Sequence, residues 1–244
     1  MKLDRLIAKH QSLGRKGARV AIARGDVLID GMVCLKIDQE VDRFRRVNLR
    51  SSVVQSPARQ LHIMVHKPLG VVSATSDIEH RTVVDLIDDP DRDSLHLVGR
   101  LDRNTSGLVL LTNDGRWSKR LMAPKQRIPK VYRVETLDSI PQEAILAFRK
   151  GFYFHTEDLI TLPAELEILG EKQARLTLYE GRYHQIKRMF HRIDNRVVKL
   201  HREQVGNLKL PANLPPGQWR HLTQDEIDNI QKETGPDPSV ATKT

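Results

Sequence analysis

A polar loop that runs directly into an apolar strand sets the strongest limit on how this chain folds. Residues 99–115 read Gly-Arg-Leu-Asp-Arg-Asn-Thr-Ser-Gly-Leu-Val-Leu-Leu-Thr-Asn-Asp-Gly. The uninterrupted apolar run 108–111 is typical of a buried strand, and the turn-forming residues 104–107 before it predict a loop. Such a loop presents Asp102 at the edge of a sheet, where a ligand can reach it. An Asp in an ordinary turn is the alternative interpretation.

The chain from Leu61 onward alternates short strands and helices without the regular spacing of a doubly wound sheet. The patterns predict strands at 108–112 and 131–137, a hairpin of 164–169 and 175–179 around Gly170, and a helix over 141–150 closed by Gly151. Asn113-Asp114-Gly115 fits a helix cap before Trp117. These elements indicate an α+β fold with a mainly antiparallel sheet.

The first 56 residues differ in charge from the rest of the chain. They hold 12 Lys and Arg against 6 Asp and Glu, whereas the other 188 residues hold 28 against 25. The net charge of +9 favours a polyanionic partner, nucleic acid before membrane. Apolar spacing predicts helices over 3–10 and 15–24 and a hairpin over 27–33 that turns at Asp30-Gly31. This division indicates a small binding domain over 1–56 and a larger domain over 61–233, and the polar, Pro-containing segment 51–59 predicts a linker at about 51–60.

The segment after Glu180 carries two opposed stripes at helical spacing. One is apolar and consists of Ile186, Met189, Phe190 and Ile193; the other is basic and consists of His184, Lys187, Arg188 and His191. An ordinary amphipathic helix with a solvated basic face would explain the pattern. Alternatively, one of these cations is the partner of a carboxylate in another part of the chain.

Four short motifs, taken in their order, resemble those of the pseudouridine synthases. They are Lys-Pro-Leu-Gly at 67–70, Gly-Arg-Leu-Asp at 99–102, Lys-Val-Tyr at 130–132 and Glu-Gly-Arg-Tyr-His-Gln-Ile-Lys-Arg-Met at 180–189. The form of the second motif that has Gly99 before Arg100 resembles the form found in the RsuA branch, whose members modify ribosomal RNA. The basic head of two helices and a hairpin resembles the S4 RNA-binding fold. The resemblance implies a catalytic domain with a mixed sheet.

The resemblance also implies roles for single residues. Asp102 would be the essential carboxylate, Tyr132 the active-site tyrosine and Lys187 the basic partner of Asp102, at a position where many relatives carry Arg. Lys lacks the bidentate fork of Arg, so this departure keeps the charge and changes the geometry. Arg188 and Arg182 are the next candidates for that partner.

We expect RNA contacts from two groups of basic residues. Arg100, Arg182 and Arg188 belong to the motifs, and Arg15, Lys16 and Arg19 lie on one side of the second predicted helix. The implied substrate is a uridine of 16S ribosomal RNA, expected at position 516, in naked RNA or in a partly assembled small ribosomal subunit. We expect a monomer.

Other site types have no support in the sequence. No nucleotide-binding or metalloprotease motif is present, and the isomerisation of uridine needs no cofactor, so we expect neither cofactor nor metal. A single cysteine, Cys34, and the lack of a long apolar run indicate a cytoplasmic protein with no membrane contact. The polar segment 234–244 is expected to be a disordered tail. Two other functions stay open: a non-catalytic RNA-binding assembly factor on the same fold, and a hydrolase that uses Asp102 with a His.

Overall fold

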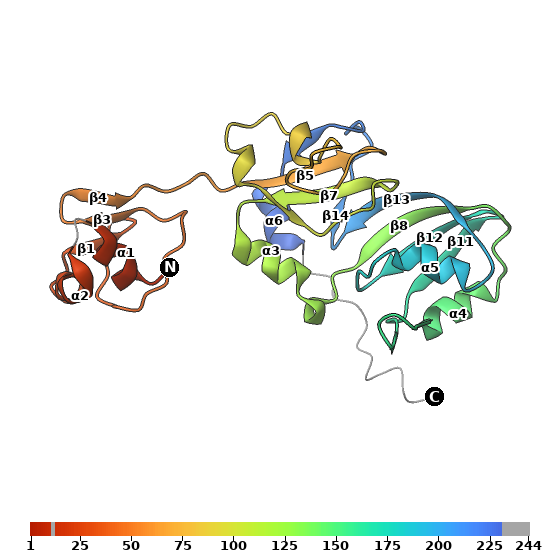
Figure 1. The fold of residues 1–244 in the computed structure, drawn as a ribbon, viewed down its shortest axis with the longest axis horizontal. Coiled ribbons are helices and arrows are strands. Elements are labelled where there is room, and N and C mark those ends of the chain that lie inside the picture. The colour runs from red at the N-terminus through yellow and green to blue at the C-terminus, as the bar shows by residue number, and fades with distance from the viewer. Residues whose placement is uncertain (11–12, 231–244) are drawn as a thin grey trace. The chain divides into compact units, whose positions relative to one another are not determined.

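The computed structural model describes residues 1–10 and 13–230. The chain divides into two compact units, Met1–Gln60 and a second that begins at Leu61 (Figure 1). The tail expected over 234–244 lies outside the described residues.

The first unit packs two helices against a small antiparallel sheet. Its core holds Leu3 and Ile7 of the first helix, Ile22 of the second and Val27 and Val47 of the strands, all fully buried. The predicted hairpin turns at Asp30 and Gly31, which both have positive φ, as a type I′ turn requires. The elements are α1 (Leu3–Lys9), α2 (Gly14–Ala23), β1 (Val27–Ile29), β2 (Met32–Val33), β3 (Val47–Leu49) and β4 (Ser52–Gln55), with strand order β2-β1-β3-β4.

The first half of the linker expected at 51–60 is not a linker but a strand of the first unit. Residues 52–55 form β4, which pairs with β3 through Asn48 and Val53. The Gln55 side chain donates to the carbonyls of Asp42 and Arg45, both at 2.8 Å. The polar composition of this edge strand gave it the appearance of a linker, because only one of its sides meets the core.

The second unit is built on a mixed sheet with strand order β11-β12-β8-β13-β7-β5-β15, in which β14 also pairs with β13 and β6 with β7. Every pair is antiparallel except β13 with β7, so the expected mainly antiparallel sheet is confirmed. Its strands are β5 (His62–Lys67), β6 (His96–Val98), β7 (Ser106–Thr112), β8 (Lys130–Thr136), β11 (Glu165–Gly170), β12 (Gln173–Leu178), β13 (Val197–Val205), β14 (Leu208–Lys209) and β15 (Trp219–His221); β9 (Tyr153–Phe154) and β10 (Leu159–Ile160) form a separate pair.

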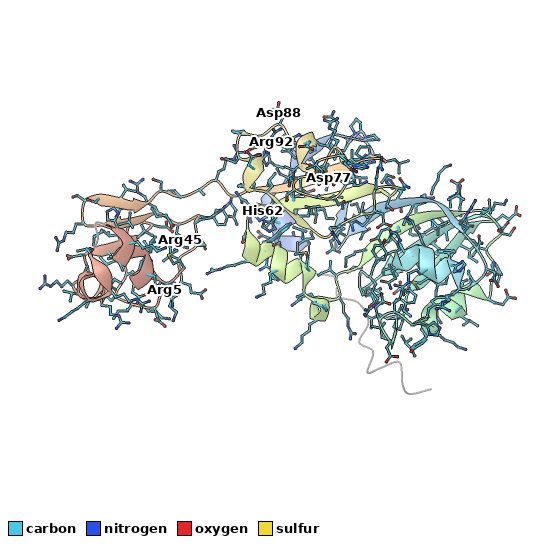
Figure 2. The ribbon with its side chains drawn as sticks, in the orientation of Figure 1. Arg5, Arg45, His62, Asp77, Asp88 and Arg92 are labelled. Atoms are coloured by element: carbon cyan, nitrogen blue, oxygen red, sulfur yellow. The ribbon has the colours of Figure 1, made fainter. Side chains whose placement is uncertain are left out.

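Alternate residues of the central strands enter two different cores. Val109 of β7 belongs to the core shared with α4 (Ala144–Lys150) and α5 (Gln185–His191), whereas Leu108 and Leu110 belong to the core shared with α3 (Gly115–Met122). Figure 1 shows α3 beside β7, with α6 (Gln224–Asn229) nearby, and α4 and α5 along β11 and β12. His62, labelled in Figure 2, sets its ring edge-on against Trp117 of α3 at 4.6 Å.

The predicted caps and turns are present with small shifts. Asp114 caps α3 by accepting from the backbone N–H groups of Arg116 and Trp117. The predicted hairpin has a shorter loop than expected, because β11 continues through Gly170 and β12 begins at Gln173, and α4 begins at Ala144 rather than at Pro141.

Gly107 brings β7 into contact with β13 where these strands run parallel. Its φ is +113°, and a Cβ atom there would lie 2.3 Å from the carbonyl oxygen of Arg202. Only glycine fits this approach. The pairing fixes the start of β7, and with it the end of the loop that carries Asp102, against β13.

Candidate active site

The loop that carries Asp102 is held from beneath by a buried lysine. Lys67, at the end of β5, is fully buried, and its ammonium group donates to the carbonyls of Pro68 at 3.0 Å, Arg103 at 3.3 Å and Thr105 at 2.7 Å. The Arg103 and Thr105 carbonyls belong to the Asp102 loop itself. The Lys67 side chain therefore fixes the Asp102 loop by binding the backbone carbonyls of that loop.

Residues 70 and 73 add further contacts to the same loop. The Gly70 N–H donates to the carbonyl of Arg103 at 3.0 Å. The Ser73 hydroxyl donates to the carbonyl of Leu101 at 2.8 Å and accepts from its N–H at 3.1 Å. The Lys-Pro-Leu-Gly motif and the residues after it thus form the support on which Asp102 is presented.

The structure brings Asp102 and Lys187 together across 85 positions of sequence. The Lys187 ammonium donates to Oδ2 of Asp102 at 3.0 Å, the pairing that the family resemblance implied. Nε2 of His184 lies 3.5 Å from the same oxygen, a contact that the sequence analysis did not anticipate. The Asp102 side chain keeps 31% of its surface exposed, so it is paired and still accessible.

These groups line a cavity of about 640 Å³ in the second unit. Tyr132 of β8 reaches its wall with little exposed surface, and Arg202 of β13 is almost fully buried there. Motif residues and their neighbours supply most of the remaining lining, among them Arg100, Asp102, Lys130, Arg182, Tyr183, His184 and Lys187.

Arg202 is a site residue to which the sequence analysis assigned no chemistry. Its Nε donates to the carbonyl of Leu108 at 2.7 Å, and its Nη1 lies 3.5 Å from the carbonyl of Arg100 and 3.5 Å from the Tyr132 hydroxyl. One guanidinium therefore connects the strand after the Asp102 loop, the Gly-Arg-Leu-Asp motif and the tyrosine. The sequence did not predict this role, because Arg202 reaches the site only through the parallel pairing of β13 with β7, which local residue spacing does not reveal.

The cavity is rich in buried positive charge. Burial, together with the nearby Arg202 guanidinium, lowers the pKa of Lys130 to about 8 against the opposing effect of Glu180. Burial also lowers the pKa of Lys67 to about 8, and Asp102 opposes that shift. Such clustering of cations around one carboxylate suits a negatively charged substrate.

The predicted RNA contacts fall into three situations. Arg100 lines the cavity and is exposed, and Arg182 lines it while paired with Glu180 at 2.9 Å. On α2, the side chains of Arg15, Lys16 and Arg19 are exposed, and Arg19 lies 3.7 Å from Asp4.

Arg188 is not free on the basic stripe as the sequence analysis expected. It donates to both carboxylate oxygens of Glu157 at 2.8 Å and lies 3.6 Å above the Phe154 ring. Donation from Arg188 and Thr156 lowers the pKa of Glu157 to about 2. The geometry engages Arg188 within the protein, because Glu157 lies in the separate β9–β10 region that the spacing did not connect to this helix.

Within residues 1–10 and 13–230, no three His, Cys, Asp or Glu side chains are grouped so that they could hold a metal ion. In the same residues no helix has the length and apolar character needed to cross a membrane.

The arrangement is suited to acid–base or nucleophilic chemistry on a nucleotide. An accessible carboxylate, that of Asp102, accepts a hydrogen bond from the Lys187 ammonium at 3.0 Å. Tyr132 offers an aromatic face in the same cavity, against which a base can stack.

Known proteins are similar to this chain in both sequence and fold. The model of the RNA pseudouridylate synthase family matches residues 61–192. The chain is 50% identical over 230 residues to the ribosomal small subunit pseudouridine synthase A of Pseudomonas aeruginosa, covering 94% of this chain and 100% of that one. The Escherichia coli protein of the same name is 38% identical over the same shares. A crystal structure of a pseudouridylate synthase, 36% identical, superposes with a TM-score of 0.69 over 94% of this chain and 99% of its own. A match of this extent, on a chain whose Asp102 loop and helix α5 meet in one cavity, shows that the protein belongs to the RNA pseudouridylate synthase family and is a pseudouridine synthase.

Proposed function

We propose that this protein isomerises one uridine of small-subunit ribosomal RNA to pseudouridine, and that the target is uridine 516 of 16S RNA. The substrate class is supported by relatives that cover nearly the whole chain and are named for the small ribosomal subunit. The observation that carries the activity is the 3.0 Å contact between Lys187 and Asp102 in a cavity lined by Tyr132.

The reaction breaks the bond between N1 of uracil and C1′ of the ribose, turns the base and joins C5 to C1′. N1 then gains a proton and C5 loses one. Asp102 acts either as a nucleophile at C1′ or as a base that removes the C2′ proton, and both routes need an ionised carboxylate. The Lys187 ammonium donates to that carboxylate at 3.0 Å and places a positive charge beside it.

Tyr132 has two assigned tasks. Its ring stacks on the uracil, and its phenol assists the departure of the C5 proton. The Arg202 guanidinium, 3.5 Å from the phenol oxygen, orients that group toward the cavity. Extruding the nucleotide costs a few kcal/mol, which stacking and phosphate contacts offset.

The first unit serves as an S4-like RNA-binding domain. Arg15, Lys16 and Arg19 on α2 contact phosphates, while Arg100 and Arg182 contact the RNA around the cavity. We assign residues 1–56 and the short segment up to Gln60 to binding, and residues from Leu61 onward to catalysis. The protein acts as a cytoplasmic monomer on free RNA or on a partly assembled small subunit.

The Asp102→Asn variant tests the catalytic assignment directly. A neutral isostere keeps the shape of the loop and removes the reactive charge, so pseudouridine formation should be abolished while RNA affinity stays within a few-fold. Measurable turnover by the purified variant would overturn the role of Asp102. Pseudouridine mapping in cells that lack the protein tests the target, and loss of a site other than 516 would correct it.

A further inference from the structure

Two adjacent aromatic rings form a stack at the wall of the catalytic cavity. The rings of Tyr183 and His184 lie 3.9 Å apart at 20°, close to parallel. Both residues line the cavity, and Nε2 of His184 is 3.5 Å from the Asp102 carboxylate. Tyr183 nevertheless keeps 73% of its surface exposed. Because His184 covers one face of the tyrosine ring, the other face is open.

The backbone beneath this stack is held in place by several polar contacts. His184 adopts a left-handed conformation with φ of 48°, which is uncommon for a residue other than glycine. The buried Gln185 accepts from the N–H of Arg182 at 3.0 Å and donates to Glu180 at 2.9 Å. Strained conformations of this kind persist where the surroundings enforce them, and they concentrate at functional positions.

Arg188 contributes to the same support. Its Nη1 lies 3.3 Å from the carbonyl of Tyr183 while both of its terminal nitrogens bind Glu157. The guanidinium thus connects the backbone of the stack to the β9–β10 region. Tyr183 is therefore an exposed ring on a rigid backbone, which lowers the entropy lost when a ligand packs on it.

From these contacts we infer that Tyr183, backed by His184, is a stacking platform for an unpaired base next to the target uridine. The inference rests on the proposed function and extends it from the flipped uridine to its neighbour. Aromatic rings bind unpaired bases through their faces with little dependence on sequence. Lys187 and Arg182 line the same cavity and supply positive charge for the phosphate between the two nucleotides.

The platform is tested by steady-state kinetics on partly assembled small subunits that carry tritium at C5 of uridine. Tyr183→Ala should raise KM by about tenfold, which corresponds to 1.4 kcal/mol and lies within the usual strength of one base–aromatic stack. Tyr183→Phe should stay within about twofold of the wild type, because the phenyl face stacks equally well.

Tyr153 provides the matched control. It is another exposed tyrosine of the second unit with a histidine neighbour, but its ring meets His155 edge-on at 87° and it is not among the residues that line the cavity. Tyr153→Ala should leave KM unchanged. If KM rises as much in Tyr153→Ala as in Tyr183→Ala, the effect comes from losing any exposed tyrosine, and the assignment of Tyr183 as a stacking platform is wrong.

A substrate lacking the neighbouring base separates stacking from other effects. With an abasic residue on the 5′ side or the 3′ side of the target, one of the two RNAs should give the wild type and Tyr183→Ala the same KM. If the tenfold difference survives on both RNAs, Tyr183 does not bind a neighbouring base. A fall in kcat with unchanged KM would likewise overturn stacking and assign Tyr183 to the positioning of His184. Failure of the wild type to release tritium would instead contradict the proposed function.

Discussion

The two units use positive charge in opposite ways. On α2 of the first unit, the side chains of Arg15, Lys16 and Arg19 are exposed, and the Arg19 guanidinium lies 3.7 Å from the Asp4 carboxylate. In the second unit, Lys67 and Arg202 are almost fully buried and donate to backbone carbonyls around the Asp102 loop. Exposed cations attract RNA over distance and are screened by salt, whereas buried cations fix atoms in place. Substitutions of cations in the first unit should therefore change RNA affinity, and substitutions in the second unit should change kcat.

The largest effect is expected where a cation meets the reactive carboxylate. Lys187→Met removes the charge and keeps most of the apolar stem, so kcat should fall by about 100-fold or more, the scale of losing one preorganised electrostatic partner. Lys187→Arg should retain much of the activity, because the charge stays near Asp102. Lys199→Met is the control, since Lys199 forms an exposed pair with Glu135 at 2.9 Å. Equal losses in Lys187→Met and Lys199→Met would contradict the assigned role.

Replacing the buried support should have the next largest effect. Lys67→Met leaves three carbonyls around the Asp102 loop without their donor, so kcat should drop by about 10- to 100-fold. RNA affinity should change little, because Lys67 is fully buried and cannot touch the substrate. Circular dichroism and thermal unfolding of the variant separate a displaced loop from a general loss of structure. A folded variant with wild-type kcat would show that the loop holds its place without Lys67.

Removing charge from α2 should change affinity and leave kcat intact. The triple variant Arg15→Gln, Lys16→Gln, Arg19→Gln should weaken RNA binding by about tenfold and reduce the slope of log K against log salt by about 0.7 for each lost contact. The matched control replaces Arg43, Arg45 and Arg46 of the same unit by Gln, which removes the same net charge elsewhere. If both triples weaken binding equally, only the net charge of the first unit matters and α2 is not a defined contact surface.

The smallest effect concerns alkaline pH. Burial lowers the pKa of Lys67 to about 8, with Arg202 adding to the shift and Asp102 opposing it. Below that pH the ammonium has three hydrogens for three carbonyls; above it the neutral amine has two, and one carbonyl loses its donor. The kcat should therefore decline less than tenfold as pH rises through about 8, in a series from pH 6.5 to 9.5. Lys130→Met removes the other lysine with a pKa of about 8, and kcat of this variant should still decline through pH 8. If kcat of the variant no longer depends on pH in this range, the decline is due to Lys130 and not to Lys67.

Local patterns predicted much of the fold. The run 108–111, the Asp30-Gly31 turn and the Asp114 cap each depend on neighbours within a few positions, and each is present. Strand β4 was mistaken for a linker because its polar residues lie at a sheet edge. The engagement of Arg188 by Glu157 was missed for a related reason: the two residues are 31 positions apart, and no periodicity connects them.

For the candidate site, the sequence by itself determined the reacting groups and their order along the chain. Helical spacing identified the basic stripe that contains Lys187, and the motifs that resemble those of the family identified Asp102 and Tyr132. The tertiary structure brings Lys187 to Asp102, as the resemblance implied, and it alone showed that Lys67 and Arg202 hold the loop and that Tyr183 is exposed. These facts depend on contacts between strands and loops tens of residues apart. Such contacts are set by sheet register and by the close approach at Gly107, which residue spacing does not encode.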